Sequence, residues 1–210
     1  HSLVVGTLAD RAANQIGANS QLARAMAYYH DLGKTENPTM FVENQIGYTN
    51  PHESLLPIES ANIIKSHVSE GVKLAKRFKI PEIVYKGIIE HHGDGVIRYF
   101  YEKEKLENSD VLKEDFRHLG QKPSSKESAI LMLADSLEAA CRAIFMVEDA
   151  DEEKIKCVIE EIFNEKIADD QLSKAPITFE ELSIIKDSFQ KSLEGLYHQR
   201  VLYPEISEEE

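Results

Sequence analysis

The stretch MAYYHDLGK, residues 26–34, decides the fold, because it places an imidazole beside a carboxylate where a helical pattern ends. Adjacent donors such as His30 and Asp31 on one turn suit a metal site. A single histidine on an apolar helical face is usually an ordinary core residue, and a His-Asp pair often arises by chance. Here five further donors lie on separate helical stretches: His1, His67, His91, His92 and Asp135. The joint pattern predicts a two-metal cluster.

The residues around these donors predict that they point toward a core. In IESANIIKSHVSEGVKLA (58–75), His67 shares a helical face with apolar residues one turn before and one turn after it. In PEIVYKGIIEHHG (81–93), both histidines emerge near a helix end that Gly93 can close. Asp135 lies on a core-facing stripe. Since a buried, unpaired carboxylate costs several kcal/mol, Asp135 needs a cation or strong donors.

The order of the donors resembles that of the HD-domain phosphohydrolases, in the subset that carries a doubled histidine and holds two metals. Five segments resemble the cytoplasmic HD domain of the seven-helix membrane HD family, whose PgpH members hydrolyse the second messenger cyclic di-AMP. These segments are HDLGKTENPTMFVENQ, NPHESLLPIESANIIKSHVSEGV, IIEHHGDGVIRYFY, ADSLEAACRA and YHQRVLYP, and the resemblance runs from residue 1 to about residue 204. The Gly-Tyr-Pro signature of cyclic di-GMP hydrolases does not follow His92, which argues against that activity.

The resemblance implies an all-α HD-domain helical bundle with a dinuclear site in which Asp31 is the catalytic bridge. One metal would take His1, His30, Asp31 and Asp135, and the other would take Asp31, His67, His91 and His92. A bridging hydroxide and a substrate oxygen would complete six-coordinate geometry, and the imidazole-rich donor set favours two manganese or iron ions over magnesium.

His1 has two interpretations. A histidine at the end of a chain is often the remnant of a tag. Here it precedes the amphipathic run SLVVGTLADRAA, as the first histidine of the family does, and we therefore expect it to be a ligand. This interpretation also implies that further sequence lies upstream.

Several other residues are candidates for substrate binding. Lys34 follows Asp31 by three residues and could hold a phosphate as a second catalytic residue, although a solvated lysine near a helix C-terminus is the ordinary interpretation. Arg142 shares a face with Asp135 and could contact substrate or pair with Glu138. Aromatic faces stack on bases and amides read their edges, so four residues could line a nucleotide pocket, with packing as the alternative: Asn44, Arg98, Tyr99 and Tyr101. We assign no metal to His52, His118 or His198, and we interpret His198 with Arg200 as structural.

Composition agrees with a nucleotide-binding globular unit. With 210 residues and 42% hydrophobic content, the chain can bury a core as one domain, residues 1–210. The net charge of −13 disfavours DNA or RNA as a partner and favours a small anionic substrate captured by local positive charge. No stretch is apolar enough to span a membrane, and Cys141 and Cys157 lack a CxxC spacing, so we expect reduced thiols in a cytoplasmic domain. The resemblance to the family also implies that this domain belongs to a larger bacterial protein that is embedded in a membrane.

The chain is expected to be almost entirely helical. Capping boxes, Ser124-x-x-Glu127 and Thr178-x-x-Glu181, mark two of the helix starts. The connection 35–56 is expected to form a wall or lid of the site, the insertion 96–122 to be partly helical, and the helices of about 151–198 to buttress the catalytic core. The expected helices span about residues 2–16, 20–31, 57–78, 81–92, 124–146, 151–167 and 178–198.

The function expected from these observations is metal-dependent hydrolysis of cyclic di-AMP to linear pApA. Three alternatives remain open: a nucleotide triphosphohydrolase of the same fold, a di-iron oxygenase, and a sensor module that binds a cyclic dinucleotide without turnover. The first alternative would release triphosphate from dNTPs. The second would consume oxygen and show a mixed-valent iron signal, and the third would bind the dinucleotide without forming a product.

Overall fold

The computed structural model describes residues 1–45, 50–145 and 151–197. Within these ranges the chain forms helices and 3-10 turns and no strand, apart from one isolated antiparallel bridge between Val96 and Arg117. The helices are α1 (Ser2–Gln15), α2 (Ser20–Tyr29), α3 (Pro57–Arg77), α4 (Glu82–Glu90), α5 (Arg98–Glu107), α6 (Lys126–Phe145), α7 (Glu152–Ala168) and α8 (Phe179–Tyr197). The prediction of an all-α fold is confirmed.

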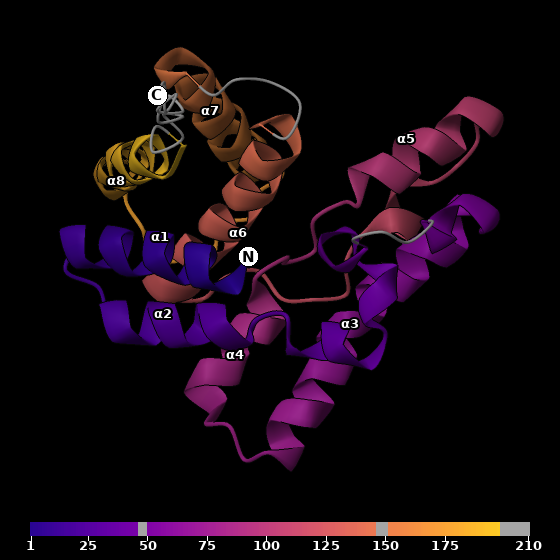
Figure 1. The fold of residues 1–210 in the computed structure, drawn as a ribbon, viewed down its shortest axis with the longest axis horizontal. Helices are drawn as coiled ribbons and strands as arrows, with labels where there is room; N and C mark the ends of the chain where they lie inside the picture. Colours follow the sequence, from indigo (N-terminus) through magenta and orange to yellow (C-terminus); the bar gives the residue numbers. More distant parts are fainter. Residues whose placement is uncertain (46–49, 146–150, 198–210) are drawn as a thin grey trace, which may run out of the picture.

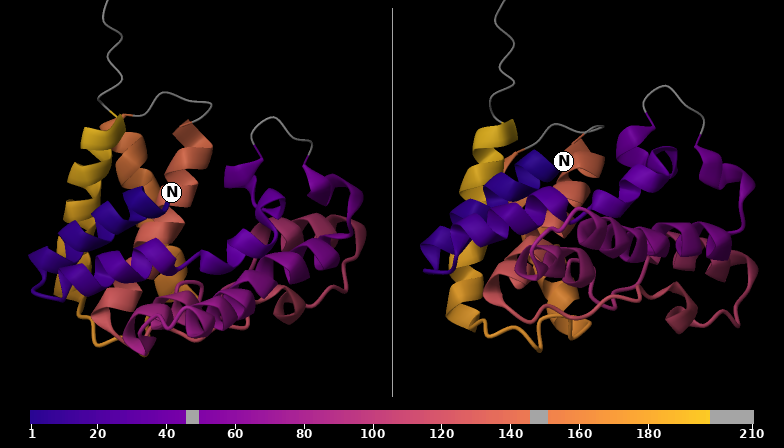
Figure 2. Two further views of the ribbon diagram at one scale, coloured as in Figure 1. Left: turned by 60° about the horizontal axis from the view of Figure 1, so that its bottom comes forward. Right: turned by 90° about the horizontal axis from the view of Figure 1, so that it is seen from below.

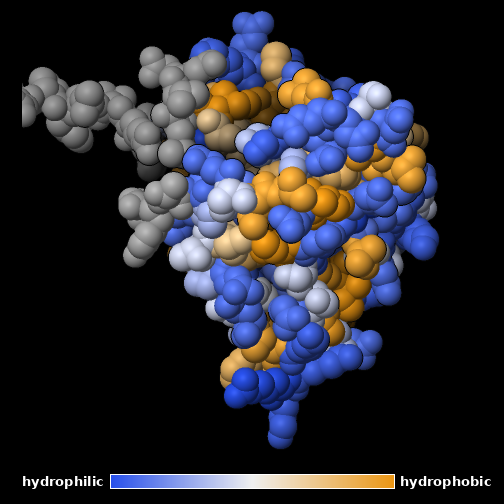
Figure 3. Space-filling view, turned by 90° about the vertical axis from the view of Figure 1, so that its right-hand side faces the viewer, coloured by the Kyte–Doolittle hydropathy of each residue, from blue (hydrophilic) through white to orange (hydrophobic). Residues whose placement is uncertain are grey.

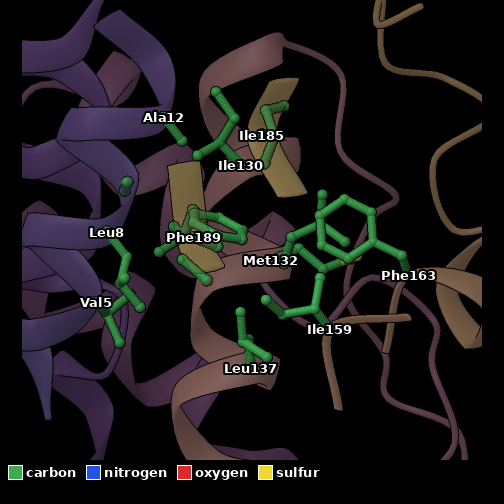
Figure 4. Close-up of a cluster of buried hydrophobic side chains, with 14 of the residues drawn as sticks. Val5, Leu8, Ala12, Ile130, Met132, Leu137, Ile159, Phe163, Ile185 and Phe189 are labelled. Atoms are coloured by element: carbon green, nitrogen blue, oxygen red, sulfur yellow. The ribbon is translucent and has the colours of Figure 1, made fainter. Parts of the chain in front are cut away.

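The larger core lies among α1, α2, α6, α7 and α8, which gather on one side of the molecule (Figure 1). α6 runs through its centre, with side chains of α1 on one side and of α7 on the other (Figure 4). Side chains of α8 join the same cluster. Ten of these side chains are Val5, Leu8, Ala12, Ile130, Met132, Leu137, Ile159, Phe163, Ile185 and Phe189. α7 packs directly against the helix that carries Asp135, and α8 packs against α1 and α7. That these two helices support the catalytic core stays a prediction.

A smaller core joins α3 and α5 on the other side of the molecule, with α4 lying between the two groups of helices (Figures 1 and 2). It is built on Ala61, Phe100 and Phe116. Tyr101 packs against Phe116 with ring centroids 5.9 Å apart, which agrees with the packing alternative for this residue. The N-terminus lies near the middle of the molecule, between the two groups (Figure 2).

The helix starts agree with one of the two predicted capping boxes. Before α8, the amide of Thr178 donates to the Glu181 carboxylate at 2.9 Å, and the amide of Glu181 donates to the Thr178 hydroxyl at 3.1 Å. The prediction of a capping box at Ser124 is wrong. α6 begins at Lys126, one residue later than that box requires, and the reciprocal bonds at its start join Ser125 to Ser128. Ser124 instead donates its amide and its hydroxyl to the buried carboxylate of Glu90, at 3.0 and 2.8 Å.

The connection after the His-Asp pair consists of short 3-10 turns: η1 (Leu32–Glu36), η2 (Pro38–Met40), η3 (Val42–Asn44) and η4 (Pro51–Ser54). Phe41 is buried and presents its ring to the edge of His67, with centroids 5.8 Å apart. His52 is also buried and donates Nε2–H to the Met40 carbonyl at 2.7 Å, so it ties two of these turns together. The connection thus packs beside one of the predicted ligands.

The insertion between the double histidine and Asp135 is partly helical, as predicted. It contains α5 and the 3-10 turn η5 (Lys113–Phe116). None of the described helices combines the length and apolar content needed to cross a membrane.

Candidate metal centre

All seven predicted donors converge between the two groups of helices. His1 precedes α1, the His30–Asp31 pair follows α2, His67 lies within α3, the double histidine follows α4, and Asp135 lies on α6. They form three overlapping groups in which potential ligand atoms lie within 4.8 Å of one another. The groups are His67, His91 and His92; His1, His30 and Asp31; and His30, His91 and Asp135.

The carboxylate of Asp31 lies between two pairs of imidazoles. Its Oδ2 is 3.4 Å from Nε2 of His1 and 3.2 Å from Nε2 of His30. Its Oδ1 is 3.7 Å from Nε2 of both His67 and His91. Both oxygens are buried and neither meets the geometry of a hydrogen bond. One carboxylate therefore presents one oxygen to each pair.

Asp135 is the second carboxylate of the cluster. Its Oδ1 is 3.1 Å from Nε2 of His1 and 3.4 Å from Nε2 of His30, and its Oδ2 is 3.8 Å from Nδ1 of His92. Its side chain is 10% exposed. Asp135 is expected to need a cation or strong donors, and a cation bound to its Oδ1 would lie on the side of His1 and His30.

Backbone hydrogen bonds orient three of the imidazoles. In each of these rings Nδ1 lies close to the carbonyl oxygen of the residue three positions earlier. The distances are 2.7 Å for His30, 2.5 Å for His67 and 2.9 Å for His91. Because Nδ1–H donates to a carbonyl, Nε2 of a neutral ring presents a lone pair to the cluster. Nε2 of His67 and Nε2 of His91 are 3.1 Å apart, and those of His1 and His30 are 3.2 Å apart.

These separations fit a cation. In a six-coordinate site with bonds of about 2.0–2.2 Å, neighbouring donor atoms lie about 3 Å apart. Lone pairs that face one another at this distance repel unless a positive charge lies between them. The carboxylate of Asp31, which presents one oxygen to each pair of imidazoles, and the paired Nε2 atoms therefore have the chemistry and the spacing of metal ligands.

The histidines on the two sides of Asp31 differ in their expected charge. Burial alone would lower the pKa of His1 and His30, but the carboxylates of Asp135 and Asp31 outweigh it and raise these pKa values to about 11 and about 10. Burial, reinforced by neighbouring imidazoles, holds the pKa of His91 and of His92 well below the ordinary value. The two carboxylates thus attract positive charge to one side, while the double histidine stays neutral, which is the form that binds metals.

The sequence did not reveal how His1 is oriented. Its Nδ1 donates to the carboxylate of Glu138, which is 5% exposed and lies one turn after Asp135 on α6. Glu138 also pairs with Arg142 at 3.4 Å, so Arg142 has the ion-pair partner that was one of its two predicted roles. The position of Glu138 three residues after Asp135, on the same helical face, is the feature of the sequence that could have indicated its contact with His1.

Lys34 lies beside Asp31. Its Nζ is 2.7 Å from Oδ2 of Asp31 and 2.5 Å from Oε1 of Glu43, and it lies 5.2 Å from the ring centroid of Phe41. Burial opposes the charge of the ammonium, but the two carboxylates outweigh it and raise the pKa of Lys34. A fixed positive charge therefore stands at the edge of the cluster.

The segment that carries Lys34 runs directly over the backbone of α3. A Cβ atom built on Gly33 would lie 1.8 Å from the carbonyl oxygen of His67 and 2.5 Å from the amide nitrogen of Gly71. Only glycine leaves room for this approach. The contact fixes His67 relative to Asp31.

Two of the residues predicted to line a nucleotide pocket have other partners, and a third is exposed. Arg98 donates to Glu165 on α7 at 2.6 Å, and Asn44 donates to the Pro38 carbonyl at 3.1 Å. Tyr99 is 70% exposed on α5. The side of the molecule that carries α5 faces the viewer in Figure 3, where hydrophilic and hydrophobic residues are intermixed. Their roles in substrate binding stay predictions.

His118, to which we assigned no metal, lies against the cluster. Its ring stacks on that of His92, with centroids 4.2 Å apart and planes 26° apart. Burial and nearby cationic groups lower the pKa of His118 to about 3. Sequence reasoning missed this contact. His198 and Arg200 lie outside the described residues.

This arrangement of helices and donors defines the class of protein. A family model described as "HD domain" matches residues 1–140, which include all seven donors. The chain belongs to the HD-domain family.

Within that family the chain is similar to PgpH proteins. It is 40% identical over 207 residues to "Cyclic-di-AMP phosphodiesterase PgpH" of Bacillus subtilis (strain 168), covering 99% of the chain and 29% of the relative. It is 42% identical over 205 residues to the protein of that name from Listeria monocytogenes serotype 1/2a (strain 10403S), covering 98% of the chain and 28% of the relative. The chain thus spans less than a third of these relatives.

A solved structure matches the fold closely. It is the L. monocytogenes phosphodiesterase PgpH HD domain in complex with cyclic-di-AMP, with a TM-score of 0.90 and 40% identity over 97% of this chain and 92% of that one. The predicted resemblance to the PgpH HD domain is confirmed.

Proposed function

We propose that this chain is a metal-dependent phosphodiesterase that hydrolyses cyclic di-AMP to linear pApA. The observation that carries the proposal is the carboxylate of Asp31, whose two oxygens face two separate pairs of imidazoles. Such a carboxylate can bridge two cations, and the PgpH HD domain, which has the same fold, binds cyclic di-AMP.

In this proposal two manganese or iron ions share Asp31. One ion would be held with His1, His30 and Asp135, and the other with His67, His91 and His92. The imidazole content favours these transition metals over magnesium. When bound, such ions supply positive charge that lowers the pKa of water and neutralises the charge that develops on a phosphodiester.

The side chains around the donors would orient the substrate. Lys34 is the described cation nearest to the bridging carboxylate, and a phosphate oxygen can compete for its Nζ with Glu43. Asn44, Arg98, Tyr99 and Arg142 remain candidates for contacts farther from the scissile phosphate. Because the chain carries a net charge of −13, a small dinucleotide suits it better than DNA or RNA.

We also propose that the chain is one HD domain, residues 1–210, that lies in the cytoplasm as part of a larger bacterial protein with a membrane-embedded region elsewhere. The support is that the PgpH relatives are more than three times as long as the part that matches.

The test is product identification with a panel of nucleotides. Metal-loaded protein should convert cyclic di-AMP to pApA, should act weakly on cyclic di-GMP, and should lose activity after chelation. Release of triphosphate from deoxynucleotides, oxygen consumption, or tight binding of cyclic di-AMP without any product would each contradict the proposal in favour of one of the alternatives above.

Changing Lys34 to Ala should slow turnover without emptying the metal site. The ammonium neutralises a phosphate oxygen, and loss of such a group costs about 10²–10³-fold in kcat. Steady-state kinetics with metal analysis would measure this effect. Lys73→Ala is the control, because Lys73 pairs with Glu70 on the surface of α3. Full activity of Lys34→Ala would make Lys34 a structural partner of Asp31 only.

A further inference from the structure

His92 is held differently from the other imidazoles of the centre. The four others each direct Nδ1 to a fixed oxygen, which is a backbone carbonyl or the Glu138 carboxylate. Within the described residues the imidazole of His92 makes no hydrogen bond, and its Nδ1 lies 3.8 Å from the nearer oxygen of Asp135. Its side chain is 25% exposed, against 10% or less for the other four. Hydrogen bonding therefore does not set its ring plane.

Within the described part of the chain, the imidazole of His92 contacts other rings instead of making a hydrogen bond. Its ring lies 3.9 Å from that of His91, tilted by 41°, and 5.2 Å from that of His67, edge on. Only the contact with His118 is stacked, at 4.2 Å and 26°. Neither nitrogen of His118 makes a hydrogen bond within the described residues, and its Nδ1 is buried. The face of the His118 ring is therefore the part that acts on His92.

The backbone around His118 is tied to the loop that follows the double histidine. The amide of His118 donates to the Gly95 carbonyl at 2.9 Å, next to the bridge between Val96 and Arg117. Arg117 donates to the Asp94 carbonyl at 2.8 Å and makes two bonds, of 3.1 and 2.9 Å, to the carboxylate of Asp169 after α7. These bonds hold the backbone that carries the His118 ring, and none of them involves a donor of the metal centre.

We infer that His118 is a positioning residue that fixes the ring of His92 by stacking, and so sets the affinity of the ion shared by His67, His91 and His92. The inference rests on the proposed two-metal centre. Groups that orient metal ligands commonly change metal affinity by about 10–100-fold when they are removed. Since stacking is weaker than a hydrogen bond to a charged group, we expect an effect near tenfold.

The experiment compares His118→Phe, which keeps a flat ring and removes both nitrogens, with His118→Ala, which removes the ring. Leu119→Ala is the matched control, because Leu119 is the next residue and is 89% exposed. Chelated proteins are titrated with Mn²⁺ in a calorimeter, bound metal is counted after desalting, and melting curves without metal check the fold. His118→Leu fills the space without a flat ring and replaces His118→Ala if that variant does not fold.

The wild type, Leu119→Ala and His118→Phe should bind two ions with similar affinity. His118→Ala should bind one ion as the wild type does and the other about tenfold more weakly. Its kcat should recover when Mn²⁺ is saturating, which a change in the catalytic groups themselves would not allow. Wild-type affinity in His118→Ala, or equal weakening in His118→Phe, would overturn the inference alone. A wild-type chain that binds fewer than two ions would overturn the two-metal centre and this inference together.

Discussion

Asp31→Asn should abolish hydrolysis and weaken both metals. An amide keeps the shape of the side chain but removes the negative charge that faces four imidazoles, and an amide nitrogen cannot act as a metal ligand. Replacing a shared ligand should cost more than the roughly 10–100-fold that removal of an outer partner costs. We therefore expect a larger loss than for any single histidine.

The same variant should melt earlier when metal is present. An ion at 100 times its Kd stabilises the folded state by about 2.7 kcal/mol, which corresponds to roughly 5–10 °C for a chain of this size. After both proteins have been chelated, the difference between their melting temperatures should be much smaller. Melting curves with and without chelator, together with metal analysis, measure this. Two tightly held ions and normal hydrolysis in Asp31→Asn would show that Asp31 is not the bridge.

Gly33→Ala should separate two of the ligands by moving a helix. The added Cβ would lie 1.8 Å from the His67 carbonyl oxygen and 2.5 Å from the Gly71 amide nitrogen, and neither backbone atom can rotate away. Overpacking of this kind usually costs about 1–3 kcal/mol of stability, and more when backbone must move. A shift of about 1 Å in catalytic geometry can cost about 10²-fold in rate. We expect both losses, measured by melting and by turnover.

The matched control for that variant is Gly195→Ala. A Cβ atom at Gly195 in α8 would have no neighbour within 4 Å, so the change should leave turnover intact. It should raise stability slightly, because alanine favours a helix by about 0.5–1 kcal/mol over glycine. Equal turnover in Gly33→Ala and the wild type would mean that α3 can shift away from Gly33 without changing the position of the His67 side chain.

The sequence predicted the helices well because their apolar residues recur at helical intervals over long stretches. Every expected helix is present in the described residues, and the ends that lie within those residues differ by at most two residues. The expected ends at residues 146 and 198 lie outside the described residues. Those differences come from competition among side chains. At the start of α6 two consecutive serines could each serve as the N-cap. The buried carboxylate of Glu90 binds Ser124, so Ser125 caps the helix.

The ligand set could be predicted because each donor stands beside apolar residues on its own helix. The supporting contacts depend on segments that are far apart in the sequence. His118 reaches His92 only because Arg117 pairs with Val96, and no local pattern contains that bridge. Glu138 was visible as a partner of Arg142, but its bond to His1 requires α1 to lie across α6. The passage of Gly33 over α3 likewise arises from packing.

The donors come from residues 1, 30–31, 67, 91–92 and 135, and this spread has a consequence for the chain as a polymer. Ions held by all of them would cross-link five distant points, and each link closes a long loop. Loop closure removes conformational entropy mainly from the unfolded chain, so such links stabilise the fold in the way that disulfides do. The metal supply then becomes a determinant of how long the folded protein persists.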